Sequence, residues 1–71
     1  MALSARNQLA GKVTSIELRG VMAEVALDIG GGNVIVAAIT RTSVENLGIA
    51  EGDDITVVIK ATEVLLATSD N

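Results

Sequence analysis

Apolar side chains recur at every second position in several short stretches of this chain, which is the pattern of β-strands that bury one face. The clearest stretch is residues 21–29, where Val, Ala, Val, Leu and Ile fall on one face. Residues 34–39 are apolar throughout, so we expect both faces of that strand to be covered, one by the core and one by a partner chain. The predicted strands cover residues 11–18, 21–29, 34–39, 55–60 and 63–68.

Glycine and polar residues mark the connections between these strands. The sequence GGGN at residues 30–33 predicts a tight hairpin, because Gly and Asn tolerate positive φ. In the first strand the alternation changes phase between Val13 and Ile16, which predicts a bulge or bend.

The stretch TRTSVENLG breaks the strand pattern and predicts a helix of about two turns over residues 42–47. Thr42 and Glu45 have the spacing of a capping box, and Gly48 is a natural C-terminal stop. The side chains expected on the buried side of this helix are those of Val44 and Leu47.

The predicted order is therefore three strands, a short helix and two more strands. This order predicts an all-β fold: a five-stranded, OB-like antiparallel barrel with one short helix between strands 3 and 4. The length of 71 residues predicts a single domain over residues 1–71.

Composition excludes several classes of function. The formal charge of −4 argues against binding to nucleic-acid backbones or to anionic membranes. The chain has no Cys and no His, which removes thiolate and imidazole chemistry. We see no secretory signal and no apolar run long enough to span a membrane, so we expect a cytoplasmic location.

Half of the chain is apolar, yet it has no aromatic residue. Hydrophobic residues make up 49% of the sequence, and Phe, Trp and Tyr are absent. A core of Val, Ile, Leu and Ala in so short a chain hides less surface than this composition supplies. We therefore expect an obligate homo-oligomer.

Three polar stretches do not follow from the strand pattern: residues 4–7, 40–43 and 60–62. Each has an ordinary interpretation, as a solvated arm, a helix cap and a surface lysine. Together, however, they supply hydroxyl, guanidinium, ammonium and backbone N–H donors and no carboxylate. Donors without acidic partners indicate a binding site for an anion.

The segments SARNQLAGKV, AEVALDIGGGNVIVAAIT, SVENLGIAEGD and VIKATEV resemble the molybdate-binding Mop domains, or molbindins, over residues 3–67. The chain is similar to the free-standing, single-domain form of that family. The resemblance implies an OB-like barrel and a homohexamer, a trimer of dimers that holds oxyanions at its subunit interfaces. By position, the segments that line the family's sites correspond to Ser4, Ala5, Arg6, Thr40, Ser43, Lys60, Ala61 and Thr62, with Asn7 beside them.

Molybdate is a tetrahedral dianion whose oxygens accept hydrogen bonds, so the protein need not coordinate the metal. Arg6 and Lys60 would balance its charge, and hydroxyls and backbone N–H groups would complete the shell. The implied function is binding of molybdate, and of tungstate, for intracellular molybdenum storage or homeostasis. We expect molybdate or tungstate as the bound ligand and no organic cofactor.

Three other classes of function fit the sequence less well. A nucleic-acid-binding OB module should carry stacking aromatics and a basic groove, which this acidic chain lacks. A swapped-barrel regulatory domain is suggested by the LGIAEGDDI turn, but DNA binding again calls for basic residues. An enzyme is not expected, because the sequence offers no nucleophile with a neighbouring base. Partners are thus expected to be copies of the chain and a small oxyanion, with no nucleic acid and no membrane.

Overall fold

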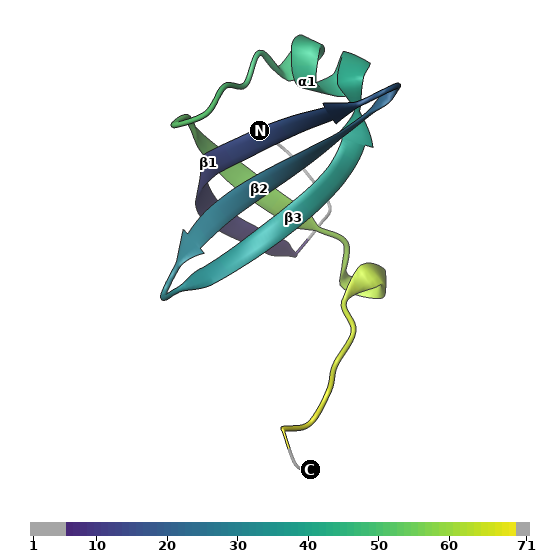
Figure 1. The fold of residues 1–71 in the computed structure, drawn as a ribbon. Helices are drawn as coiled ribbons and strands as arrows, with labels where there is room; N and C mark the ends of the chain where they lie inside the picture. Colours follow the sequence, from purple (N-terminus) through teal and green to yellow (C-terminus); the bar gives the residue numbers. More distant parts are fainter. Residues whose placement is uncertain (1–5, 70–71) are drawn as a thin grey trace.

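A computed structural model of the chain describes residues 6–69. These residues form one curled antiparallel sheet with a short helix at one end (Figure 1). The strands are β1 (Asn7–Arg19), β2 (Met22–Gly30), β3 (Asn33–Thr40) and β4 (Asp54–Ile59). Helix α1 (Arg41–Leu47) separates β3 from β4, and a 3₁₀ turn, η1 (Ala61–Glu63), follows β4.

The strand order across the sheet is β3-β2-β1-β4, so β3 and β4 are its two edges. Every neighbouring pair is antiparallel. The register of β1 against β2 shifts between Val13 and Ser15, which confirms the predicted bulge. Because β1 pairs with β2 over its second half and with β4 over its first half, the sheet curls around the inner face of this long strand.

The core lies on the inner face of the curled sheet. Among the described residues its buried members are all aliphatic: Val13, Ala23, Val25, Leu27 and Val57. Apart from Val57, the inward side chains of β3 and β4 pack against this cluster but are only partly buried. The alternation that predicted the inner face of β2 is thus confirmed in its centre, whereas Val21 lies in the turn before β2 and is exposed.

The two predicted connections flanking β3 are present, with one change. The glycines of the β2–β3 hairpin adopt positive φ, as expected for GGGN. Helix α1 ends at Gly48, whose φ is 65° and whose N–H donates to the carbonyls of Glu45 and Val44. The predicted cap at Thr42 is wrong: the N-cap is Thr40, whose backbone is extended and whose side-chain oxygen accepts the N–H of Ser43.

The expectation that Leu47 lies on the buried side of α1 is also wrong. Its side chain is 61% exposed, and Val44 alone of the expected pair packs against the core. A helix of only seven residues presents a narrow face to the core, so one of its turns packs there and the other does not. No helix in residues 6–69 is long and apolar enough to cross a membrane.

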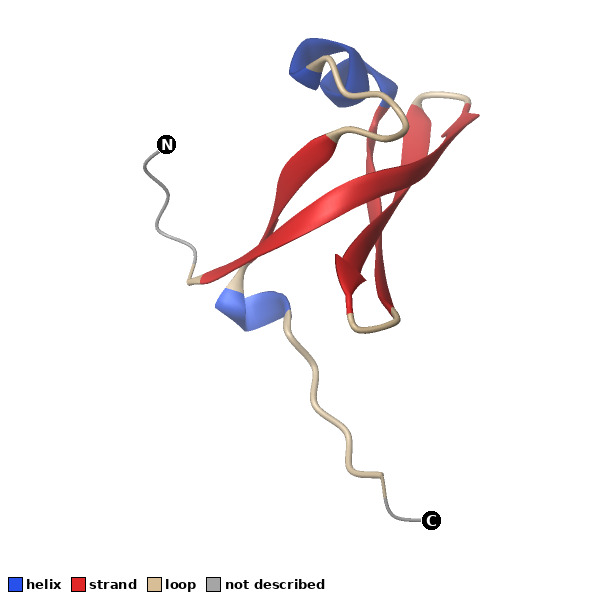
Figure 2. Cartoon of the chain, turned by 90° about the vertical axis from the view of Figure 1, so that its left-hand side faces the viewer, coloured by secondary structure: helices blue, strands red, loops and turns tan. Residues whose placement is uncertain are grey.

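The predicted fifth strand over residues 63–68 is absent from the described chain. Residues 61–63 form η1, and residues 64–69, which we call the tail, run extended away from the sheet and form no strand of it (Figure 2). The hydrogen bonds of η1, from Glu63 N to the Lys60 carbonyl and from Val64 N to the Ala61 carbonyl, set this direction. The pattern of the tail is strand-like, but a strand also needs an edge to pair with.

Candidate functional site

The pairing of β1 with β4 brings two of the three predicted donor segments together. Asn7 and Ile59 are Cα partners at the end of this ladder. Arg6 directly precedes Asn7 in sequence, and Lys60 directly follows Ile59. The two cations therefore stand at the same end of the sheet, although 54 sequence positions separate them (6 to 60).

A side-chain bond reinforces this junction. The amide Nδ2 of Asn7 donates to the carbonyl oxygen of Ile59 at 3.2 Å, and the bond is partly buried. Ala61 and Thr62 lie next in the chain, within η1. The first bond inside η1 is donated by Glu63, so the N–H groups of Ala61 and Thr62 are not used by that turn.

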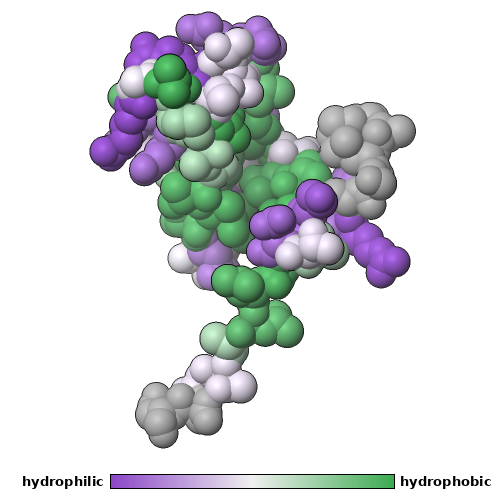
Figure 3. Space-filling model, turned by 90° about the vertical axis from the view of Figure 1, so that its right-hand side faces the viewer, coloured by the Kyte–Doolittle hydropathy of each residue, from purple (hydrophilic) through white to green (hydrophobic). Residues whose placement is uncertain are grey.

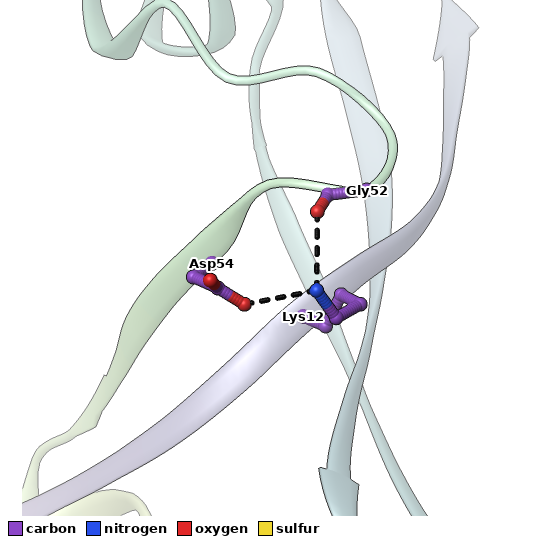
Figure 4. Close-up of polar contacts among 3 residues, drawn as sticks. All are labelled: Lys12, Gly52 and Asp54. Carbon is purple, nitrogen blue, oxygen red and sulfur yellow. Dashed lines mark hydrogen bonds and ion pairs between the residues drawn. The ribbon is translucent and has the colours of Figure 1, made fainter.

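The cations at this junction differ from the other cations of the described chain. Lys12 donates to Asp54 Oδ1 at 3.0 Å and to the Gly52 carbonyl at 3.3 Å (Figure 4). Arg19 forms ion pairs with Glu17 and Glu24, and Arg41 Nε donates to the Gly20 carbonyl at 2.9 Å.

Within residues 6–69, neither Arg6 nor Lys60 has a carboxylate or hydrogen-bond partner. Both side chains belong to exposed residues. Two neighbouring cations without an internal counter-ion leave their charge available to an external anion.

The remaining donor segment lies at the opposite end of the same sheet. Thr40 is the partner of Met22, and Met22 is also the partner of Arg19 at the far end of β1. The 13 residues of β1 correspond to roughly 40 Å of strand. One chain therefore does not bring Thr40 and Ser43 to Arg6 and Lys60.

Thr40 and Ser43 themselves form a close pair. Their hydroxyl oxygens lie 2.7 Å apart, and Thr40 Oγ1 also accepts the backbone N–H of Ser43 at 3.0 Å. One of the two hydroxyl protons is used within the pair, so one is left for another acceptor. The remaining predicted residues, Ser4 and Ala5, lie outside the described residues.

The chemistry of the junction fits hydrogen bonding to an anion. Residues 6–69 contain no group of three or more His, Cys, Asp or Glu side chains arranged to hold a metal ion. What they supply at the β1–β4 junction is a guanidinium, an ammonium, a hydroxyl and backbone N–H groups. The sequence does not predict the role of the Ile59 carbonyl as the acceptor for Asn7, because every residue type has a main-chain carbonyl.

Comparison with known proteins identifies the family. The TOBE domain model matches residues 3–66. The chain belongs to the TOBE domain family. Among curated relatives, this TOBE domain is similar to molybdenum-pterin-binding protein 1 of Clostridium pasteurianum. The two are 50% identical over 66 residues, which cover 93% of this chain and 97% of that protein.

Solved structures of similar proteins share the fold of this TOBE domain. A molybdate-binding protein from Sporomusa ovata aligns with a TM-score of 0.88 at 40% identity, covering 96% of this chain and all of that one. The cytoplasmic molybdate-binding protein ModG, in a form with molybdate bound, aligns with a TM-score of 0.80 at 44% identity. That alignment covers 86% of this TOBE domain and 43% of ModG.

Proposed function

We propose that this chain binds molybdate, and tungstate in the same way, as a store or buffer of intracellular molybdenum. The observation that carries the proposal is the β1–β4 junction, where Arg6 and Lys60 adjoin the last pair of the ladder and have no counter-ion among the described residues. Relatives that cover nearly the whole chain are named for molybdenum or molybdate, which supports this ligand over other dianions. The cytoplasmic location of ModG supports the same location here.

The ligand we propose is the free oxyanion, without an attached pterin, although several relatives are named molybdenum-pterin-binding proteins. A pterin ring is flat and bicyclic, and aromatic side chains are the residues that stack on such rings. The chain has no Phe, Trp or Tyr, whereas its hydroxyl, N–H and cationic donors suit a compact dianion. The role is binding and release, with no catalytic step.

The ligand-binding residues we propose form two sets. One set is at the β1–β4 junction and consists of Arg6, Lys60, Ala61 and Thr62, with Asn7 beside them. Ser4 and Ala5, which precede Arg6 in the sequence, are proposed as ligands of the same set. Thr40 and Ser43 form the other at the start of α1. Because the two sets lie at opposite ends of one sheet, each is completed by donors from another copy, with the anion at the interface.

A homo-oligomer, which we propose to be a hexamer built as a trimer of dimers, accounts for the apolar surface. Leu65 and Leu66 in the tail are 92% and 93% exposed. Figure 3 shows apolar side chains along the upper part of the tail and on the body of the molecule. Val34 and Val36 on the edge strand β3 are exposed as well. Surface of this kind in a single copy indicates an interface.

The tail of one copy would then complete the five-stranded barrel of another. Its apolar run from Val64 to Ala67 suits a strand covered on both faces, as does β3. Both β3 and β4 have a free edge. Strand β4 is antiparallel to β1, whereas β3 is parallel to β1 because it pairs with β2, so β3 and β4 run in opposite directions. An incoming tail closes both edges, antiparallel to one strand and parallel to the other.

The test is calorimetric titration of the purified, oxyanion-free protein with molybdate, with sulfate as the matched dianion. Saturable heat with molybdate and little with sulfate is the expected result, because we propose that the assembled site is sized for the larger anion. Absence of heat from correctly assembled protein would contradict the proposal. Light scattering on the same sample gives the mass, and a monomer mass would contradict the oligomer.

A further inference from the structure

Among the described ligands predicted at the β1–β4 junction, Asn7 is the one whose side chain already has a hydrogen bond within residues 6–69. Its Nδ2 donates to the Ile59 carbonyl, which joins the first residue of β1 to the last residue of β4. We propose that Asn7 is a positioning residue, which holds the Arg6 and Lys60 segments together so that both cations face one anion. This inference rests on the proposed function and reassigns Asn7 from ligand to support.

The location of the bond makes it suited to this task. Asn7 and Ile59 form the terminal pair of the β1–β4 ladder, and after Lys60 the chain turns away through η1. The ends of ladders open most readily, since few contacts hold them. A partly buried side-chain bond at this pair resists opening at the point where the two cationic segments leave the sheet.

The hydrogen bond from Asn7 to Ile59 opposes electrostatic repulsion between the two neighbouring cations. Arg6 and Lys60 flank the pair on the two strands, and no carboxylate neutralises either of them within residues 6–69. Before an anion binds, these two like charges, each one residue from the Asn7–Ile59 pair, repel one another and favour separation of the strand ends. Asn7 keeps them together in the empty protein, so less ordering remains to be done when the anion binds.

Asn7→Ala tests this role, with Thr14→Ala as the matched control. Thr14 is also on β1, and its Oγ1 donates to the Ala26 carbonyl at 3.1 Å, a bond of the same kind between β1 and β2. We expect Asn7→Ala to weaken molybdate binding about fivefold, the equivalent of one ordinary hydrogen bond. Thr14→Ala should bind as the wild type does. Wild-type affinity in Asn7→Ala, or an equal loss in both variants, would overturn the proposal.

A salt series separates positioning from general loss of stability. Because salt screens the repulsion between the two cations, the stability that Asn7→Ala loses should shrink as sodium chloride is raised. The loss in Thr14→Ala should stay constant, since no pair of like charges adjoins that bond. Identical salt dependence in the two variants would overturn the electrostatic role of Asn7.

The side-chain amide resonance of Asn7 separates positioning from direct binding. In anion-free protein one Nδ2 proton should already be protected from exchange, and molybdate should leave it so. An amide that is unprotected in the empty protein and becomes protected only with molybdate would make Asn7 a ligand and overturn the proposal. If the wild type binds no molybdate while the anion-free amide is protected, the proposed function fails for reasons unrelated to Asn7.

Discussion

Thr40 and Ser43 share a hydrogen bond of 2.7 Å between their hydroxyl oxygens, while Thr40 Oγ1 also caps α1 through the N–H of Ser43. One oxygen thus serves two contacts, and the two side chains together retain one proton to donate outward. The pair makes the predicted binding hydroxyls part of the local structure that begins the helix.

This arrangement predicts different effects for the two alanine variants. Thr40→Ala removes the cap and should lower the free energy of unfolding by about 1 kcal/mol. Ser43→Ala keeps the cap, because the backbone N–H of residue 43 still donates to Thr40, and should cost less. Urea denaturation at one fixed protein concentration measures both. Equal losses in the two variants would contradict the assignment of the cap to Thr40.

Removal of either junction cation should weaken anion binding far more than removal of a paired cation. Arg6→Ala or Lys60→Ala each deletes a charged donor, which corresponds to about 1.5–3 kcal/mol, or roughly 10- to 150-fold in molybdate affinity. Lys12→Ala is the control, since Lys12 is occupied by Asp54 and Gly52. Calorimetry with molybdate gives the affinities. If Lys12→Ala lost as much affinity as the other two, net charge alone would explain the effect.

Polar substitution in the tail should break up the oligomer. The double variant Leu65→Ser with Leu66→Ser removes the two most exposed leucines of the described chain, which we place in the barrel of a neighbouring copy. Its mass by light scattering is expected to fall below that of the wild type. Leu47→Ser on α1, another exposed leucine, serves as the control and should keep the full mass. A full-sized assembly in the tail variant would contradict the proposal that the tail of one copy completes the barrel of another.

Molybdate should raise the stability of the assembled protein by mass action. A ligand present at one hundred times its dissociation constant adds about 2.7 kcal/mol per site when it binds the folded form alone. The thermal midpoint should therefore rise with molybdate concentration, and sulfate at equal concentration should have little effect. In the Arg6→Ala variant the rise should be much smaller. Equal shifts with both anions would point to a general salt effect.

Much of the sheet could be predicted from alternation alone. The central strands, the bulge after Val13, the glycine hairpin and the stop at Gly48 depend on neighbours within a few residues, so the sequence displays them directly. The alternation predicts a strand from residue 11, whereas β1 begins four residues earlier, at Asn7. This first part of β1 is a strand because β4 pairs with it, and β4 begins 47 positions later in the chain (7 to 54).

The sequence by itself determined the residue types that the function requires: hydroxyls, amides and two cations in three segments, in an acidic chain without His, Cys or aromatic rings. It also determined the alternation that builds the inner core. The tertiary structure decided which of those segments meet, because strand pairing between distant segments places Arg6 beside Lys60 and leaves Thr40 at the other end. It likewise decided that the tail is not a strand of its own chain's sheet, since a strand forms only where a sheet edge pairs with it, whatever its own pattern.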